Sequence, residues 1–388
     1  MFASRTAWQL APNRLSRALE RLKAGGKGIV DLTASNPTIL GFQYDRATIA
    51  SSLTQPAILQ YSPQPRGLQC AREAVVAYYR ERGEQTPSPE QIVLTSSTSE
   101  AYSFVFRLLC DPGDELLVPV PSYPLFEFIT TLNDVRSVPY HLFYDHGWHV
   151  DLHDLEGRIT KRTRAIVVVH PNNPTGSYIS DVAGQQLNEL CSRYRLALIS
   201  DEVFLDYQLD DAKKQSFVCN GEALTFTLSG ISKICALPQM KLAWIVVGGP
   251  GEMVTDALSR LEIIADTYLS VSTPVQLALP TLLATRMNIQ RQLFERIHAN
   301  VAELDALIAA RGAFTRLHLE GGWSAVLRVP VTQCDEELAL TLLEKHSVLV
   351  YPGHFFDFPP EGYLVVSLIV PPEIFASGVR KLAAVIAS

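Results

Sequence analysis

Between residues 90 and 250 the chain alternates short apolar runs with longer stretches of helical periodicity, and this alternation most restricts its fold. It is typical of βαβ units, in which helices join parallel strands and cover the sheet. We expect strands at 92–94, 115–120, 164–169, 196–200, 223–228 and 242–247, and helices at 98–110, 123–132, 180–194 and 252–268. The sequence therefore predicts an α/β protein with a mostly parallel central sheet and helices on both faces.

From about residue 276 the pattern changes to a long helical stretch that ends near Gly312. After it we expect short strands near 323–329, 348–351 and 363–369, and helices over 335–346 and 371–386. The prediction is a large domain over 45–275 and a smaller α+β domain made of 1–44 and 276–388.

Charge and composition argue against several kinds of partner. The chain has 33 basic and 40 acidic residues, a net charge of −7, which offers no basic field to nucleic acid. Its most apolar runs have the length of strands and fall far short of the roughly 20 residues of a membrane helix. The six cysteines form no C-x-x-C pair, so neither a metal site nor a disulfide framework is indicated. We expect a cytoplasmic protein without nucleic-acid or membrane partners.

Polar residues follow the predicted strands at the points where each strand ends, where doubly wound sheets bind ligands. The hydroxyl-rich run 95–100 opens a helix and could hold an anion, or simply cap that helix. Tyr123 follows the next strand and could stack on a flat ring, although most such aromatics only pack. The run 170–176, His-Pro-Asn-Asn-Pro-Thr-Gly, is a proline-stiffened turn that directs an asparagine amide out of the sheet.

Two charged residues complete this edge. Asp201 follows the apolar run Leu-Ala-Leu-Ile-Ser, so its carboxylate has limited water and needs a cationic partner. Lys233 lies among small and apolar residues, where desolvation lowers the pKa of the amine and suits it to Schiff-base chemistry. The plain alternative is a lysine that extends to solvent.

Taken together and in this order, these segments resemble the class I and II aminotransferases of fold type I, which use pyridoxal 5′-phosphate (PLP). The resemblance runs from about Asn36 to Ser367, and its most specific parts are 171–176 (PNNPTG), 201–202 (Asp-Glu) and 229–233 (Ser-x-x-Ser-Lys). It implies a PLP-transferase fold and ping-pong transfer of an amino group between a small-molecule amino donor and a keto acceptor.

The resemblance also implies roles around the cofactor ring. Lys233 would form the internal aldimine with PLP, and Asp201 would pair with the protonated pyridine nitrogen. Asn173 would donate a hydrogen bond to the phenolic oxygen, and Tyr123 would stack on the ring.

A second set of residues is implied for the cofactor phosphate. Ser97 and Thr98, with Ser96 as a further candidate, would cradle it. Lys241 stands where an arginine usually binds the phosphate. A lysine keeps the positive charge but cannot make the two parallel hydrogen bonds of an arginine. Tyr61 matches a position that reaches the phosphate of the neighbouring subunit, which implies a homodimer with shared active sites.

The sequence departs from the family pattern at three places. Phe204 stands where most relatives have a tyrosine that donates to the phenolic oxygen, and the sequence leaves open whether Tyr207 replaces it. Gly230 stands where a phosphate-binding serine is common. Val365 occupies the position of the arginine that binds the substrate α-carboxylate in the family. Either another cation replaces that arginine, with Arg66 and Lys27 as the nearest candidates, or the substrate has no α-carboxylate.

Two alternatives to transamination remain at this stage. A PLP-dependent lyase, decarboxylase or racemase would use the same fold and cofactor, because neither determines which bond to the substrate carbon breaks. A non-catalytic PLP-binding module, such as the effector domain of a transcription regulator, would need a DNA-binding extension. The basic N-terminal helix is too short to be one.

Overall fold

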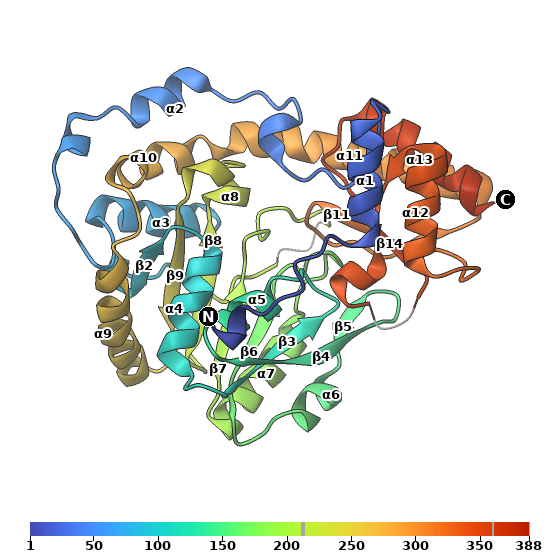
Figure 1. Cartoon of the computed structure of the whole chain (residues 1–388). Coiled ribbons are helices and arrows are strands. Elements are labelled where there is room, and N and C mark those ends of the chain that lie inside the picture. Colours follow the sequence, from blue (N-terminus) through green and yellow to red (C-terminus); the bar gives the residue numbers. More distant parts are fainter. Residues whose placement is uncertain (211–213, 359–360, 388) are drawn as a thin grey trace.

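An eight-stranded sheet forms the centre of the structure, a computed structural model that describes residues 1–210, 214–358 and 361–387 (Figure 1). Its strands are β2 (Ile92–Thr95), β3 (Glu115–Val120), β4 (Arg136–Tyr144), β5 (Trp148–Val150), β6 (Thr163–Val169), β7 (Ala197–Asp201), β8 (Thr225–Gly230) and β9 (Ala243–Gly248). They lie in the order β2-β9-β8-β7-β6-β3-β4-β5, and every neighbouring pair from β8 to β4 is parallel. The predicted mostly parallel central sheet is confirmed.

Helices cover both faces of this sheet because successive strand residues point to opposite sides. On one face, Ala165 and Val167 belong to a core with α4 (Thr98–Leu109), α5 (Phe126–Leu132) and α9 (Gly251–Tyr268). On the other, Ile166 and Val168 pack with α7 (Asp181–Tyr194), while Ile92 packs with α3 (Gln69–Glu81) and α10 (Thr273–Ala284). Shorter helices of this part are α2 (Arg46–Ser52), α6 (Leu152–Gly157) and α8 (Ile231–Ile234).

A smaller antiparallel sheet lies beside the large one. It consists of β10 (Thr315–Arg316), β11 (Ser324–Arg328), β14 (Tyr363–Ser367) and β13 (Tyr351–Pro352), in that order. Its helices are α1 (Arg14–Ala24), α11 (Arg286–Arg311), α12 (Asp335–His346) and α13 (Pro372–Ile386). The expected smaller α+β part is therefore present.

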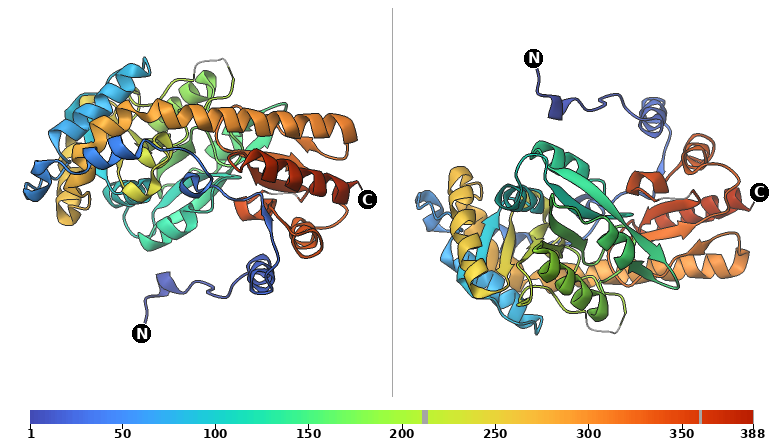
Figure 2. Two further views of the ribbon diagram at one scale, coloured as in Figure 1. Left: turned by 90° about the horizontal axis from the view of Figure 1, so that it is seen from above. Right: turned by 90° about the horizontal axis from the view of Figure 1, so that it is seen from below.

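The two ends of the chain meet in this smaller part. Strand β1 (Val30–Asp31) pairs in parallel with β12 (Val348–Leu349), and α1 packs against α12. The predicted domain boundary after residue 275 falls inside α10, and the division into 45–275 and 1–44 with 276–388 stays a prediction. The predicted long helical stretch consists of two helices, since α10 ends before Thr285 and α11 then extends into the smaller part (Figure 2).

Within residues 1–210, 214–358 and 361–387, no helix combines the length and the hydrophobicity needed to cross a bilayer. No three His, Cys, Asp or Glu side chains gather there in a way that could hold a metal ion. The six cysteines are all free thiols.

Candidate active site

A cavity of about 450 Å³ lies where the carboxyl ends of β6 and β7 meet the smaller sheet. Five of the eight predicted site residues line it: Thr98, Tyr123, Asn173, Asp201 and Lys233. They come from loops or helices that follow β2, β3, β6, β7 and β8, so the fold gathers residues that lie far apart in the sequence.

Lys233 lies on the short helix α8, directly after β8. Its Nζ is 5.2 Å from the centre of the Phe204 ring and 4.9 Å from that of Trp323. It donates no hydrogen bond to another described residue. Burial lowers the pKa of the Lys233 amine to about 8, against the opposing charge of Asp201. The amine is therefore poised near its neutral, nucleophilic form.

Asp201 ends β7, and two donors hold its carboxylate. Oδ1 accepts the Val203 N–H at 3.1 Å, and Oδ2 accepts the Tyr102 hydroxyl at 2.9 Å. Burial raises the pKa of Asp201 to about 6, while these hydrogen bonds and Lys233 act in the opposite direction. The sequence analysis missed Tyr102, for which the only signal is a tyrosine in the apolar helix α4.

The 171–176 loop uses its two asparagines differently. Asn172 donates to the Pro121 carbonyl at 3.0 Å and to Thr175 Oγ1 at 2.8 Å, so its buried amide holds the loop together. Asn173 instead lines the cavity, with its Oδ1 3.5 Å from Ser324 Oγ of the smaller sheet. The amide predicted to point out of the sheet is therefore that of Asn173.

Two motif glycines lie where segments approach closely. A Cβ at Gly176, whose φ is +70°, would lie 2.4 Å from the Gly321 carbonyl oxygen. A Cβ at Gly230 would lie 2.8 Å from the Cβ of Ala243 on β9. The serine common in the family at position 230 would collide with β9 in this chain.

Three predicted phosphate-site residues do not line the cavity. Ser97 caps α4, and its Oγ accepts the Glu100 N–H at 3.2 Å. Lys241 is exposed, and Tyr61 is 82% exposed. The backbone N–H of Ser96 donates to the Glu100 carboxylate at 2.6 Å. In the single chain, Thr98 and Ser99 are the hydroxyl residues of this run that face the cavity.

The structure places all three residues at which the sequence departs from the family pattern. Phe204 and Val365 both line the cavity, and Gly230 is explained above. The Tyr207 hydroxyl donates to the Lys233 carbonyl oxygen at 2.7 Å, and Tyr207 is not among the lining residues. Neither Arg66 nor Lys27 lines the cavity.

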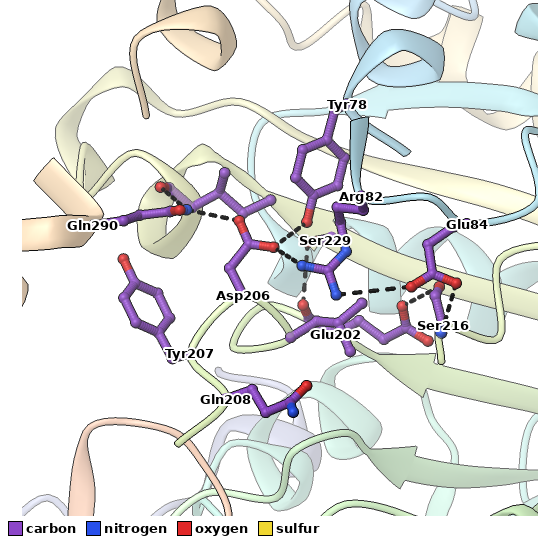
Figure 3. A network of polar contacts seen from close by, with 12 residues as sticks. Tyr78, Arg82, Glu84, Glu202, Asp206, Tyr207, Gln208, Ser216, Ser229 and Gln290 are labelled. Carbon is purple, nitrogen blue, oxygen red and sulfur yellow. Dashed lines mark hydrogen bonds and ion pairs between the residues drawn. The ribbon is translucent and has the colours of Figure 1, made fainter. Parts of the chain in front are cut away.

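A buried polar network around Arg82 and Asp206 contacts the helix that carries Lys233 (Figure 3). The Arg82 guanidinium pairs with Asp206 and lies 3.8 Å from Glu84. The Asp206 carboxylate also accepts the Gln290 side-chain amide at 2.7 Å. That amide donates as well to the Ile234 carbonyl at 2.9 Å, one residue beyond Lys233. The network thus ties α11 to the helix that carries Lys233.

Glu202, next to Asp201, points into this network and away from the cavity. It accepts hydrogen bonds from the Ser216 hydroxyl at 2.5 Å, the Phe217 N–H at 2.8 Å and the Ser200 hydroxyl at 3.0 Å. Burial raises the pKa of Glu202 to about 7. Asp201 therefore faces the cavity, whereas the adjacent Glu202 holds the polar network together.

Comparisons with known proteins agree with this geometry. The family model for aminotransferase class I and II matches residues 27–373. Glutamate-pyruvate aminotransferase AlaA of Escherichia coli K12 is 27% identical over 357 residues, which cover 90% of this chain and 88% of that protein. Alanine aminotransferase of Mycobacterium tuberculosis is 28% identical over 378 residues, which cover 93% and 86%.

Solved structures share the fold. Alanine aminotransferase from Pyrococcus furiosus aligns with a TM-score of 0.90 at 22% identity, covering 100% of this chain and 99% of that one. An Escherichia coli aminotransferase aligns with a TM-score of 0.88 at 24% identity, covering 100% and 98%. The resemblance seen in the sequence motifs is confirmed, and the chain belongs to the class I and II aminotransferases, enzymes of fold type I that depend on PLP.

Proposed function

We propose that this enzyme exchanges an amino group between an amino donor and a keto acceptor at the cavity, with Lys233 as the residue that holds PLP. The observation that carries the proposal is the pairing of a desolvated amine and a buried carboxylate in one cavity, Lys233 and Asp201. Burial displaces the pKa of each group toward neutrality, against the effect of their opposite charges, and such shifts are typical of reactive sites.

The described residues fit the cofactor. The Lys233 amine loses its proton more readily than an exposed lysine, is free of hydrogen bonds within the described chain, and lies on α8 directly after β8. At another strand end, the hydroxyls of Thr98 and Ser99 lie at the N-terminus of α4, where the helix dipole favours an anion such as a phosphate. When bound, PLP supplies a carbonyl that reacts with amines and a ring that takes up electrons from the substrate carbon.

The chain's own residues then have distinct tasks. Asp201, held by Tyr102 and the Val203 N–H, would keep a proton on the ring nitrogen. The Lys233 amine would carry a proton to and from the substrate carbon, for which a pKa of about 8 is well matched near neutral pH. Asn173 would donate to the ring oxygen, and Tyr123 would cover the ring.

We also propose that the enzyme is a homodimer with composite sites. Tyr61 is 82% exposed and lies outside the cavity of its own chain. A large aromatic exposed to this extent is free to enter a neighbouring subunit. Lys241 and Ser97 keep their proposed roles at the phosphate. A cytoplasmic location stays a prediction.

Borohydride reduction of the enzyme loaded with PLP, followed by peptide mapping, tests the assignment of Lys233. The label is expected on the peptide that contains Lys233, and Lys233→Met should abolish it. Lys381→Met, at an exposed lysine of α13, is the matched control and should leave labelling unchanged. Label on another lysine would contradict the site.

A donor half-reaction separates transamination from elimination, decarboxylation and racemisation. One equivalent of amine should yield one equivalent of carbonyl product and convert the cofactor to its amine form without acceptor. A reaction that releases ammonia or carbon dioxide and returns the cofactor unchanged would favour the alternative chemistry.

A further inference from the structure

The cavity that holds Lys233 is poor in positive charge. Lys233 is the only cationic side chain among the described residues that line it, and Asp201 is the only acidic one. Under the proposed function, on which this inference rests, the Lys233 amine is occupied by the cofactor. A substrate carboxylate therefore meets no free cationic side chain among the described residues that line the cavity.

The smaller sheet forms the opposite wall of the cavity from neutral side chains. Val365 and Ser367 on β14 point to the same face as Ser324 of β11, because Ser324 pairs directly with Ser367. Tyr351 of β13 pairs with Val365. All four residues line the cavity. Val365 stands where the family resemblance leads us to expect an arginine. It is an apolar side chain flanked by hydroxyls.

Two buried donors at this wall lack partners. Ser367 Oγ and Trp323 Nε1 make no hydrogen bond to any residue that the structure describes, and the two residues are only 4% and 3% exposed. An unsatisfied buried donor costs about 1–3 kcal/mol, so a side-chain rotation that brings either group to an acceptor in the adjoining cavity is favoured. Both donors are neutral, so they can bond an oxygen but supply no positive charge to offset the desolvation of an anion.

Nearby arginines are engaged elsewhere. Arg296 donates to the Leu40 carbonyl at 2.6 Å and to the Ile369 carbonyl at 3.2 Å, and its guanidinium lies over the Phe42 ring. Arg66 pairs with Glu262 at 2.6 Å. Neither lines the cavity, so neither supplies the missing charge in the single chain.

We propose that the site accepts primary amines whose amine-bearing carbon carries a neutral oxygen group, such as a hydroxymethyl or a carboxamide, in place of a carboxylate. Val365 removes the carboxylate clamp, and Ser367 donates to the neutral oxygen. In the half-reaction the substrate carbon gives its nitrogen and an electron pair to the cofactor and takes oxygen from water, which leaves a ketone. The keto acceptor reverses these changes and obeys the same restriction.

A matched series of amines tests the proposal on the enzyme loaded with PLP. The series consists of L-phenylalanine, L-phenylalaninol, L-phenylalaninamide and 2-phenylethylamine. All four share the 2-phenylethylamine skeleton, and their amine-bearing carbon carries a carboxylate, a hydroxymethyl, a carboxamide or only hydrogen. Stopped-flow absorbance of the cofactor band gives the rate constant for each, and the alanine series repeats the test with a small body. The alcohol or amide should react faster than the amino acid by on the order of a hundredfold, because the carboxylate is left unpaired.

Binding gives a readout that is independent of turnover. Calorimetry of the loaded enzyme with 3-phenyl-1-propanol and with 3-phenylpropionate compares the neutral and anionic groups on a body without an amine. The alcohol should bind and the acid should not. Tighter binding of the acid would overturn the proposal.

Two substitutions locate the effect. Val365→Arg should raise the rate with phenylalanine and lower that with phenylalaninol, whereas Val365→Met, of similar length without charge, should keep the wild-type order. Ser367→Ala should lower the rates for the alcohol and the amide by about tenfold more than that for 2-phenylethylamine. An equal loss for all four amines would assign Ser367 a structural role and contradict its role as donor.

The outcomes separate this inference from the proposed function. If the loaded enzyme reacts with the amino acids as fast as with their alcohols, the substrate class is wrong and the aminotransferase site stands. If the enzyme holds PLP but reacts with no amine of either series, both are wrong. Failure to take up PLP also overturns both.

Discussion

The hydroxyl of Tyr207 donates a hydrogen bond to the backbone carbonyl of Lys233 over 2.7 Å. Tyr207 is fully buried, and its ring packs edge-on against Trp323 at 5.0 Å between centres. This contact orients the helix that carries the lysine, so Tyr207 is a positioning residue and does not replace the hydroxyl absent at Phe204. Among the described residues, Asn173 is left as the donor that we propose for the cofactor's ring oxygen.

Tyr207→Phe should therefore destabilise the protein by about 1–2 kcal/mol, because the Lys233 carbonyl loses its buried donor. PLP should still bind to Lys233, but the pH at which the absorption band of the bound cofactor changes should shift. Urea unfolding and a spectral pH titration measure the two effects. Tyr194→Phe, whose hydroxyl meets Glu156 at the surface, is the control and should change neither.

The pairing of Arg82 with Asp206 behind the site should contribute strongly to stability. Asp206 is 5% exposed in its side chain, so Asp206→Ala leaves the Arg82 guanidinium buried without its main counter-charge. We expect a loss of about 3–5 kcal/mol in the free energy of unfolding. Asp256→Ala, which removes an exposed ion pair with Arg260, should cost less than about 1 kcal/mol. Equal losses would show that the network adds nothing.

The lowered pKa of Lys233 predicts how the stability of the cofactor-free chain depends on pH. The unfolded lysine titrates near 10.5 and the folded one at about 8, so between these values the unfolded state binds more protons. Stability relative to Lys233→Met should therefore rise as the pH increases from about 8 to 10.5, by up to about 3 kcal/mol. Urea unfolding of both proteins across this range gives the difference. A flat difference would show that Lys233 is not desolvated.

The hydroxyl of Tyr102 should keep Asp201 ionised. This hydrogen bond lowers the pKa of Asp201 against the effect of burial, so Tyr102→Phe should raise that pKa above about 6. The acid limb of the rate profile should then move to higher pH, while Asp201→Asn should bind PLP and lose most of its activity. Tyr268→Phe on α9, remote from the cavity, serves as control. An unchanged acid limb in Tyr102→Phe would contradict the role given to this hydroxyl.

Strands and turns that depend only on consecutive residues could be predicted from the sequence. The apolar run before Asp201 and the glycine- and proline-rich run around Asn173 indicate strand ends and turns by themselves. The central sheet and most of its strands followed from such local patterns. Strand β4, next to the edge strand β5, was missed because Pro139 and its mostly exposed or half-buried residues mask the strand pattern.

Features that depend on the docking of distant elements could not be predicted. Tyr102 reaches Asp201 only through the position of α4 over the sheet, and Tyr351 and Ser367 reach the cavity through the smaller sheet. The break at Thr285 was missed because helical periodicity continues through it. Whether Tyr207 replaces the missing hydroxyl depends on side-chain direction, which periodicity does not encode.

The exposed ring of Tyr61 supports the prediction that each active site uses residues of two subunits. Lys233→Ala lacks the amine proposed to hold PLP, and Tyr61→Phe lacks a hydroxyl proposed to reach the partner's phosphate. If Tyr61→Phe alone is impaired, mixing the two variants should restore activity, because half of the sites in a heterodimer contain both native residues. Statistical mixing makes half of the dimers mixed, so recovery approaches about a quarter of wild-type activity per site. Verified subunit exchange without recovery would show that Tyr61 serves its own chain, and a monomer in sedimentation would exclude sharing altogether.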